Sequence, residues 1–391
     1  MNEKQHVFII GSKGIPAMYG GFETFIEKLT QYRKDNQIQY HVSCLSDNKN
    51  EFQYNNAHCF NIPVPNIGAA KAVYYDLAAL RYCCGYIRTN MIQHAVVYLL
   101  ACRIGPFVHR YKKQLQQLGS HLFVNPDGHE WKRGKWNPII KKYWKLSEKL
   151  LVQHSELMIC DSRNIEEYIK EDYKQRNPRT VFISYGADTS KSTLSDSSLK
   201  LTNWYKENNI SPKGYYLVVG RFVPENNYET MIKEFIRSKT KKDLVIITGV
   251  NDNAFYKKLK SETDFDKNSK VKFVGAIYDQ DLLKKIRENA YGYIHGHEVG
   301  GTNPSLLEAL ASTNLNLLLD VGFNREVGED GALYWNKEPQ NLAGLISKAD
   351  MMPIKEVEQL SVKAKKRISS YYNWDNIVNC YENVFSNVIN M

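Results

Sequence analysis

The segment 295–308 carries the densest set of groups in the chain that could bind or transform a substrate. Its sequence is His-Gly-His-Glu-Val-Gly-Gly-Thr-Asn-Pro-Ser-Leu-Leu-Glu, a glycine-rich loop followed by a Pro and a Ser that are typical of a helix start. The unpaired backbone N–H groups of a first helical turn attract anions. Glu298 lies in the loop and Glu308 one turn into the helix. We therefore expect an anion-binding site with two carboxylates beside it.

The same segment contains His295, His297 and Glu298, which are residue types that bind metals. Their spacing lacks the i, i+4 arrangement of His-Glu-x-x-His on a helix, and no further cluster of ligands accompanies them. The Asp-x-Asp pairs at 264–266 and 279–281 flank polar helix starts, where Asp acts as a cap or a solvated charge. We therefore predict no metal site and no cofactor.

Two other loops could approach a substrate. The loop 11–21 is glycine-rich and precedes a helix, so its backbone could contact a phosphate or a sugar, although the glycines could also only turn the chain. It matches neither G-x-G-x-x-G nor the P-loop pattern. In 219–227, Arg221 directly follows an apolar run, and at the carboxyl end of a parallel strand it could bind a diphosphate or pair with a surface carboxylate.

The elements that must position these loops alternate between strands and helices along the whole chain. Short apolar runs predict strands at 6–10, 40–45, 96–101, 121–124, 157–160, 215–220, 243–249, 271–275, 292–295 and 315–319. Helical spacing predicts helices at 22–30, 71–88, 105–118, 137–154, 163–173, 229–238, 281–289 and 305–312. The pattern indicates two consecutive α/β domains, 1–188 and 199–371, joined by the polar, serine-rich segment 188–198.

The composition excludes several classes of protein. The 391 residues are 43% hydrophobic and 24% charged, which is typical of globular chains and unlike disordered or disulfide-stapled ones. The longest apolar run, 95–102, is far shorter than the ~18 residues of a membrane-spanning helix. The N-terminus lacks the pattern of a secretory signal, and the seven cysteines are scattered. We therefore expect a protein of the reducing cytoplasm.

Most of the net charge of +10 comes from residues 101–150, where 11 Lys and Arg stand against 3 Asp and Glu. Within 131–151, aromatic and basic residues are interleaved, as in helices that lie on anionic membranes. A solvated helix and a nucleic-acid surface are the alternatives. The helical spacing of Ile139, Ile140, Tyr143, Leu146 and Leu150 predicts that part of this face is core.

Taken together, several motifs resemble family 4 glycosyltransferases of the GT-B fold. They are Gly-Gly-x-Glu at 20–23, Tyr-Gly-Ala-Asp at 185–188, Gly-Arg-x-x-Pro-Glu-Asn-Asn at 220–227, the 298–308 segment and Asn-Arg-Glu at 324–326. They occur in the order of that family and span most of the chain. The segments 9–24, 125–133 and 160–165 are similar to bacterial rhamnosyltransferases that build capsule and cell-wall polysaccharides.

The resemblance implies an α/β fold of the GT-B class, with two Rossmann-like domains, a cleft between them and a terminal helix within 372–391 that packs back on the first domain. It implies retaining transfer of L-rhamnose from dTDP-β-L-rhamnose to a lipid-diphosphate-linked GlcNAc or glucose through a β-1,4 linkage, without a metal, at the inner face of the plasma membrane. The alternatives are a GT-B transferase for another nucleotide sugar such as a UDP-hexose, a non-catalytic sugar-nucleotide sensor and a nucleic-acid-binding protein.

The resemblance also implies roles for individual residues. Arg221 would contact the diphosphate, Glu308 the ribose and Glu298 the donor sugar, while Asp127 would accept the proton of the acceptor hydroxyl. The donor-binding set is Gly20, Gly21, Arg221, Asn226, Gly301, Thr302, Asn303, Ser305 and Glu308, and the acceptor-binding or membrane-facing set is Tyr19, Glu23, His129, Lys132, Arg133, Lys141 and Lys142.

Two positions depart from the family pattern. The two carboxylates of the family stand as E-x7-E, but the residue eight before Glu308 is Gly300, so that the role falls to Glu298. Many relatives carry a lysine where this chain has Asn226, so one positive charge near the diphosphate is missing. Lys13, in the loop 11–21, could replace it.

Overall fold

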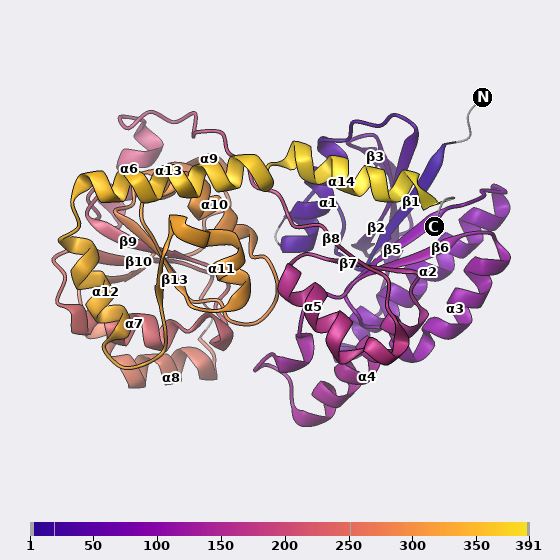
Figure 1. Ribbon diagram of the computed structural model, residues 1–391, viewed down its shortest axis with the longest axis horizontal. Coiled ribbons are helices and arrows are strands. Elements are labelled where there is room, and N and C mark those ends of the chain that lie inside the picture. The colour runs from indigo at the N-terminus through magenta and orange to yellow at the C-terminus, as the bar shows by residue number, and fades with distance from the viewer. Residues whose placement is uncertain (1–3, 19, 251, 389–391) are drawn as a thin grey trace. The chain divides into compact units, whose positions relative to one another are not determined.

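The computed structural model describes residues 4–18, 20–250 and 252–388 (Figure 1). The chain divides into two compact units, one of Met1–Gly186 with Trp374–Met391 and one of Ala187–Asn373. We call them the first and the second unit. Each is a mainly parallel sheet with helices on its faces (Figure 1).

The first unit contains an eight-stranded sheet in the order β3-β4-β2-β1-β5-β6-β7-β8, parallel except for β3. The strands are β1 (Gln5–Ile10), β2 (Ile38–Ser46), β3 (Glu51–Tyr54), β4 (Ala57–Pro63), β5 (Val96–Leu100), β6 (His121–Asn125), β7 (Leu157–Cys160) and β8 (Thr180–Phe182). The helices are α1 (Gly21–Gln31), α2 (Lys71–Thr89), α3 (Gly105–Gln117), α4 (Pro138–His154), α5 (Arg163–Asp172) and α14 (Trp374–Ser386). The chain winds outward from β1 in one direction and from β5 in the other, so the strand order reverses between these two strands. Open parallel sheets bind ligands at the carboxyl ends of the strands beside such a reversal.

Helix α14, at the end of the chain, packs on α1 and β1 of the first unit (Figure 1). The Glu382 carboxylate accepts hydrogen bonds from the backbone N–H groups of Lys34 and Asp35, 2.9 and 3.0 Å away. The ring of Tyr381 lies 4.9 Å from that of Phe25. Tyr381 and Glu382 lie on the buried side of α14, so this helix contributes to the core of the first unit.

The second unit contains a six-stranded parallel sheet in the order β11-β10-β9-β12-β13-β14. Its strands are β9 (Tyr215–Val219), β10 (Asp243–Ile247), β11 (Val271–Phe273), β12 (Gly292–His295), β13 (Asn316–Leu319) and β14 (Leu333–Trp335). Its helices are α6 (Leu199–Glu207), α7 (Tyr228–Ser238), α8 (Ala254–Thr263), α9 (Gln280–Glu288), α10 (Pro304–Ser312), α11 (Gly322–Gly328), α12 (Asn341–Asp350) and α13 (Ile354–Tyr371). Alternate residues of β9 enter two separate apolar clusters, since Tyr216 and Val218 join one and Tyr215 and Leu217 the other. Both faces of the sheet are therefore buried, and the strand order reverses between β9 and β12.

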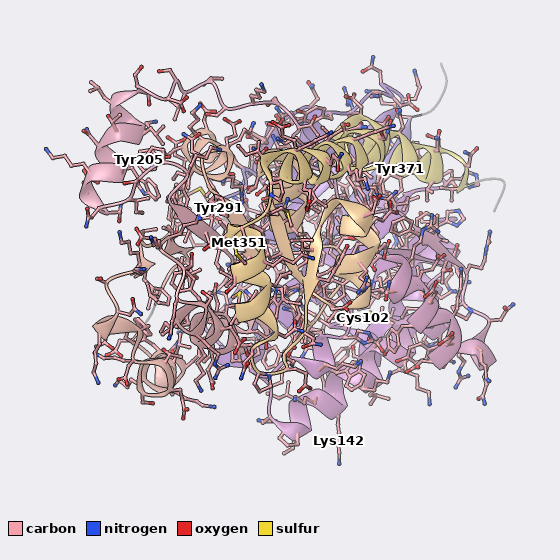
Figure 2. The ribbon with its side chains drawn as sticks, turned by 60° about the vertical axis from the view of Figure 1, so that its left-hand side comes forward. Cys102, Lys142, Tyr205, Tyr291, Met351 and Tyr371 are labelled. Carbon is pink, nitrogen blue, oxygen red and sulfur yellow. The ribbon has the colours of Figure 1, made fainter. Side chains whose placement is uncertain are left out.

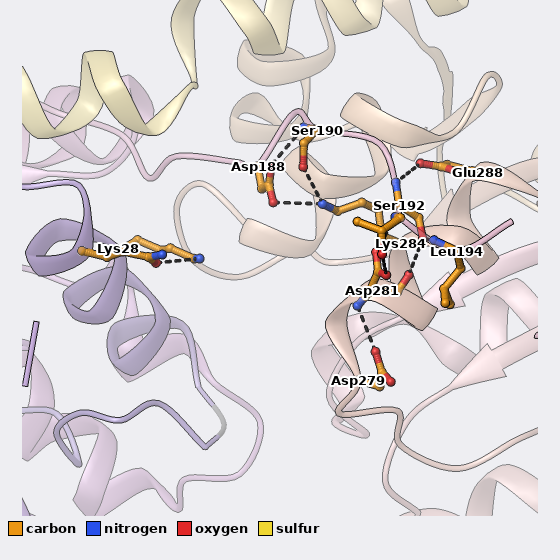
Figure 3. Close-up of polar contacts among 11 residues, drawn as sticks. Lys28, Asp188, Ser190, Ser192, Leu194, Asp279, Asp281, Lys284 and Glu288 are labelled. Carbon is orange, nitrogen blue, oxygen red and sulfur yellow. Dashed lines mark hydrogen bonds and ion pairs between the residues drawn. The ribbon is translucent and has the colours of Figure 1, made fainter. Parts of the chain in front are cut away.

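The polar segment 188–198 does not run free between the units but is bound along α9 (Figure 3). Asp188 pairs with Lys284 at 2.9 Å, and the backbone N–H of Ser192 donates to Glu288 at 2.7 Å. Asp281 accepts hydrogen bonds from Thr193, and Asp279 is the N-cap of α9. The prediction that the Asp-x-Asp pair 279–281 is a cap is therefore right for Asp279, whereas Asp281 fastens the segment rather than being merely solvated.

Helix α4 forms where predicted, and of its predicted core face Ile140, Tyr143 and Leu150 are half-buried, whereas the prediction is wrong for Ile139 and Leu146. Ile139 and Leu146 are 80% and 50% exposed, and the helix buries Ser147, Glu148, Leu151 and Val152 instead. The close approach of α3 explains this orientation, because the backbone N–H of Gly105 donates to Ser147 Oγ at 2.7 Å and a Cβ on Gly105 would overlap the backbone of Ser147. The buried Glu148 accepts hydrogen bonds from the hydroxyls of Tyr168 and Tyr173.

Throughout the described residues, the structure has no helix that combines the length and the apolar character needed to span a bilayer.

A chain of three histidines and a glutamate crosses four neighbouring strands of the first unit. His6 Nδ1 lies 2.8 Å from His41 Nε2, His41 Nδ1 lies 2.9 Å from His58 Nδ1, and His58 Nε2 lies 2.9 Å from the Glu51 carboxylate. Burial, reinforced by repulsion from His6 and His58, lowers the pKa of His41 to about 2. His41 is therefore neutral in the folded protein at any physiological pH.

We expect this histidine to make folding sensitive to acid. Below about pH 6.5 the unfolded chain binds a proton at His41 that the folded chain does not bind, so stability falls as the pH falls. One such proton changes the free energy of unfolding by about 1.4 kcal/mol per pH unit. In urea unfolding between pH 6 and 4, His41→Gln should flatten the slope of stability against pH by about this amount. Equal slopes in the wild type and the variant would contradict the prediction.

Candidate donor and acceptor sites

In the second unit, the loops that follow β9 and β12 lie side by side where the strand order reverses. Asn227 Nδ2 donates to the carbonyl of Gly296 at 2.8 Å, and the backbone N–H of Glu298 donates to the carbonyl of Glu225 at 3.1 Å. These bonds fasten the Arg221 loop to the Glu298 loop. The structure thus brings together the two segments of this unit that the sequence singled out.

Arg221 is exposed immediately after β9, as its predicted contact with a phosphate requires. Asn226 is buried and its side chain is used inside the loop, since Nδ2 donates to the carbonyl of Arg221 at 2.7 Å and Oδ1 lies 2.7 Å from His297 Nδ1. Because Asn226 Oδ1 is an acceptor, this His297 nitrogen must carry the proton. Asn226 therefore stabilises the backbone of Arg221. Its side chain is not exposed to a donor substrate, contrary to the prediction.

Helix α10 begins beside this loop pair, and its first turn is partly capped from within. Asn303 is the N-cap, and its Oδ1 accepts from the backbone N–H groups of Ser305 and Leu306 at 2.9 and 3.4 Å. Ser305 Oγ donates to the carbonyl of Val219 at 3.2 Å. Ser305, which was predicted to contact the donor substrate, thus forms its hydrogen bonds within the protein. The loop residues Gly301 and Thr302 lie just before the cap.

Each predicted carboxylate of the second unit pairs with a basic residue that the sequence did not single out. Lys337 Nζ lies 2.6 Å from Glu298 Oε2, and Arg287 Nη2 lies 2.6 Å from Glu308 Oε2. Arg287 is a core residue of α9, where it follows Leu283 by four positions on the buried side. In the sequence, Arg287 stands at a position of α9 where helical spacing predicts an apolar core residue. This mismatch could have identified Arg287 as a buried cation with a charged partner.

Two histidines of the 295–308 segment are buried near these carboxylates. Burial lowers the pKa of His295 to about 3, so its imidazole is neutral, and its Nδ1 lies 3.4 Å from the hydroxyl of Tyr293. Gly300 has φ +138°, and a Cβ there would lie 3.3 Å from His297 Nε2. A glutamate at position 300 would therefore be strained in this loop conformation.

In the first unit, the loop 11–21 is held by Glu23 of α1. The Glu23 carboxylate accepts from the backbone N–H of Lys13 at 2.7 Å and occupies the space that a Cβ on Gly20 would need. Gly20 has φ +131° and is the residue before α1, which begins at Gly21. Glu23 thus shapes the loop and is not free to face an acceptor as predicted. The predicted residue Tyr19 lies outside the described residues.

The same loop is tied to the sheet by a buried ion pair. Arg103 Nη1 lies 3.1 Å from Asp76 Oδ2 and donates to the carbonyl of Gly11 at 2.8 Å. Burial raises the pKa of the Asp76 carboxyl to about 6, against the opposing effect of Arg103. Neither residue was predicted, because the pair joins α2 to the loop after β5, which are distant in sequence.

Asp127 follows β6 in a turn at the carboxyl end of the sheet. Its φ is +62°, a conformation that Asp and Asn tolerate, and its backbone N–H donates to Asn125 Oδ1 at 2.8 Å. Arg133 Nη2 lies 3.7 Å from Asp127 Oδ2, and Arg133 also pairs with Glu130. Arg133 is buried in this cluster, so the prediction that it faces a membrane is wrong.

The remaining predicted residues of this region lie nearer the surface. The ring of His129 lies 4.2 Å from that of Tyr168, tilted by 51°, and burial with the nearby Lys132 and Lys145 lowers the pKa of His129 to about 4. Lys132 and Lys142 are exposed and Lys141 is half-buried. The side chain of Lys142 extends from the outer side of α4 (Figure 2). In the described part of the chain, no three His, Cys, Asp or Glu side chains gather as metal ligands would.

Comparison with known proteins finds a family match in each unit. Residues 202–367 match the family of glycosyl transferases group 1, and residues 4–188 match a domain of unknown function, DUF1972. The segment that is similar to group 1 glycosyltransferases contains Arg221, Glu298, Glu308 and their ion-pair partners.

A curated relative of the chain is the O-antigen chain mannosyltransferase RfbU of Salmonella typhimurium. It is 24% identical over 242 residues, which are 61% of this chain and 62% of the relative. The chain therefore spans less than two thirds of the length of that relative.

Solved structures resemble the whole chain at low sequence identity. The sucrose-phosphate synthase of Thermosynechococcus elongatus has a TM-score of 0.79 at 14% identity and covers 99% of both chains. A glycosyltransferase of Rickettsia africae has a TM-score of 0.74 at 12% identity and covers 100% of this chain and 99% of its own. The predicted fold class, GT-B with two α/β units of parallel sheet, is confirmed.

Proposed function

We propose that the protein is a retaining glycosyltransferase whose donor is a nucleotide sugar bound by the second unit. One observation carries this proposal: in the segment that matches group 1 glycosyltransferases, the Arg221 loop, the Glu298 loop and the start of α10 lie together at the strand ends where the sheet order reverses, and Glu308 follows one turn into α10. The guanidinium and loop amides would stabilise the negative charge of the departing diphosphate without a metal, and Glu308 would hold the nucleoside.

For the sugar, we propose L-rhamnose from dTDP-β-L-rhamnose, on the similarity of the segments 9–24, 125–133 and 160–165 to rhamnosyltransferases. The acceptor would be a lipid-diphosphate-linked GlcNAc or glucose, joined through a β-1,4 linkage. Mannosyl transfer is the second candidate, since the curated relative is named as a mannosyltransferase.

Product analysis tests the activity. The purified protein is incubated with dTDP-rhamnose, UDP-glucose or GDP-mannose and a lipid-diphosphate-linked GlcNAc, with and without EDTA, and product mass and anomeric configuration are determined. We expect a rhamnosylated lipid of retained configuration, formed equally in EDTA. A hexose-sized mass increase with GDP-mannose alone would replace rhamnose by mannose, and no transfer from any donor would overturn the proposal.

Binding measurements test the donor site separately from turnover. Arg221→Ala and Glu308→Gln should each weaken dTDP binding about tenfold, because a hydrogen bond to a charged group contributes about 1.5–3 kcal/mol. Arg237→Ala is the matched control, since Arg237 pairs with Glu234 at the far end of α7. Unchanged dTDP affinity in both site variants, measured by calorimetry, would contradict the assignment.

We further propose that the protein works in the cytoplasm and docks on the inner face of the plasma membrane through the outer face of α4. This face consists of Ile139, Lys142, Leu146 and Lys149, which follow one another at intervals of three and four residues. All four side chains are exposed. A row of alternating apolar and basic side chains on a helix suits the surface of an anionic bilayer.

The charges around α4 support this proposal. The three acidic residues of 101–150 are turned inward: Glu130 and Glu148 are buried, and Asp127 lies beside Arg133. Lys145 of α4 is paired with Glu148 and Asp172, whereas the exposed Lys142 and Lys149 form no ion pair among the described residues. A phospholipid surface attracts such cations with about 1 kcal/mol for each Lys near it.

Charge reversal tests the docking face. The triple change Lys132→Glu, Lys142→Glu and Lys149→Glu should weaken binding to phosphatidylglycerol vesicles at least tenfold in sedimentation, given about 1 kcal/mol for each lysine. The control reverses Lys241, Lys355 and Lys366, exposed lysines of the second unit, and changes the net charge equally. If both triple variants bind alike, the outer face of α4 is not the docking surface.

A further inference from the structure

The ion pair between Arg287 and Glu308 determines how much of the Glu308 carboxylate a ligand can reach. Arg287 Nη2 lies 2.6 Å from Glu308 Oε2, and it also lies 3.4 Å from Ser305 Oγ. Among the described residues, Arg287 is the one polar partner of this carboxylate. Oε2 is thus engaged, and Oε1 is left to accept hydrogen bonds.

Arg287 is fixed in this position by its burial and by the bonds that its two ends make. It is 3% exposed, and its carbonyl accepts from Thr313 Oγ1 at 3.1 Å, so both ends of the residue are held. Glu308 lies on α10 with its side chain 31% exposed. If Glu308 turned away, the guanidinium of Arg287 would be buried without a charged partner. Leaving a buried charge unpaired costs more free energy than breaking an exposed ion pair. The pair should therefore persist when a ligand binds.

The number of free carboxylate oxygens matters for recognition of a nucleoside. The ribose of a ribonucleotide presents two neighbouring hydroxyls, which a free carboxylate can bind with its two oxygens. A 2′-deoxyribose presents one ring hydroxyl, and a single oxygen is enough for it. We propose that Arg287, by holding one oxygen of Glu308, adapts the nucleoside site to a 2′-deoxyribonucleoside diphosphate. This inference rests on the proposed function, because Glu308 must be the residue that meets the nucleoside.

Arg287 is accordingly a positioning residue that acts through Glu308 and sets donor specificity. It supplies no direct contact with the ligand. Its replacement should release Oε2 and let the 2′-hydroxyl contribute to binding. A merely structural role would weaken the binding of both kinds of nucleotide alike.

Two diphosphates that differ in one hydroxyl test the inference. Calorimetry on the full chain compares dTDP with ribothymidine diphosphate, which has the same base and an added 2′-hydroxyl. The wild type should bind the two within about threefold of each other. In Arg287→Met, the ribonucleotide should gain at least fivefold relative to dTDP, since a freed carboxylate oxygen accepts the second hydroxyl. In Glu308→Gln, both should bind more weakly.

The outcomes separate this inference from the proposed function. A wild type that binds the ribonucleotide more than tenfold tighter than dTDP overturns the inference alone and needs no variant that folds. An unchanged ratio in a folded Arg287→Met, or in the smaller change Arg287→Gln, also overturns it. If the wild type binds neither diphosphate, the proposed donor site fails and the inference falls with it.

Discussion

Asp127→Asn should lower the rate of sugar transfer by about 10²–10⁴-fold while dTDP binds as before, because general-base catalysis contributes factors of this size. The variant removes one charge beside Arg133, which keeps its ion pair with Glu130. Asn tolerates the φ of +62° at this position, and the backbone N–H of residue 127 keeps its bond to Asn125 Oδ1. The loop should therefore keep its shape, and the loss should appear in kcat.

Asp35→Asn provides the matched control. Asp35 is also an aspartate of the first unit that accepts a backbone hydrogen bond, from Gln37 at 2.8 Å, but it precedes β2 at the opposite end of the sheet. It should leave transfer unchanged. Measuring kcat with saturating donor, together with dTDP affinity, separates the two effects. Transfer that survives both Asp127→Asn and the double change with Glu298→Gln would refute the catalytic role of these carboxylates.

The sequence was sufficient for the order of elements and for the loops that gather at the strand ends. Apolar runs and helical spacing mark most strands and helices, because these patterns depend on neighbouring residues. Arg221 could be located in the same way, since only Gly220 separates it from a run of five apolar residues, Tyr215–Val219. Glu308 could be placed one turn into α10 because Pro304 and Ser305 are typical of a helix start.

What the sequence did not predict depends on partners that are distant along the chain. The orientation of α4 is decided by the close approach of Gly105 to Ser147, and by the tyrosine hydroxyls that satisfy the buried Glu148. Arginine is usually found at the surface, yet Arg133 is buried and pairs with Glu130 and Asp127. A polar residue can be buried when its hydrogen-bond partner is buried with it. The spacing of apolar residues in the sequence does not predict such pairs.

The pair of Asp76 and Arg103 extends this point to the energetics of the first unit. Arg103→Met should lower the free energy of unfolding by about 3–5 kcal/mol at pH 7, because it leaves the fully buried Asp76 without its partner. Burial already raises the pKa of this carboxyl to about 6. Without Arg103 nothing opposes the effect of burial, so the pKa of Asp76 should be higher in the folded variant than in the folded wild type, and the loss of stability should grow as the pH rises from 5 to 8.

The double change Asp76→Asn with Arg103→Met distinguishes stability from positioning. It removes the buried charge along with its partner, so urea unfolding should recover most of the lost stability, since uncharged replacements of a buried pair are often neutral. It does not restore the hydrogen bond from Arg103 to the carbonyl of Gly11, which ties the loop 11–21 to the sheet. If that bond positions the loop for transfer, the stable double variant should still have a raised KM. Recovery of both stability and KM would mean that Arg103 serves the fold alone.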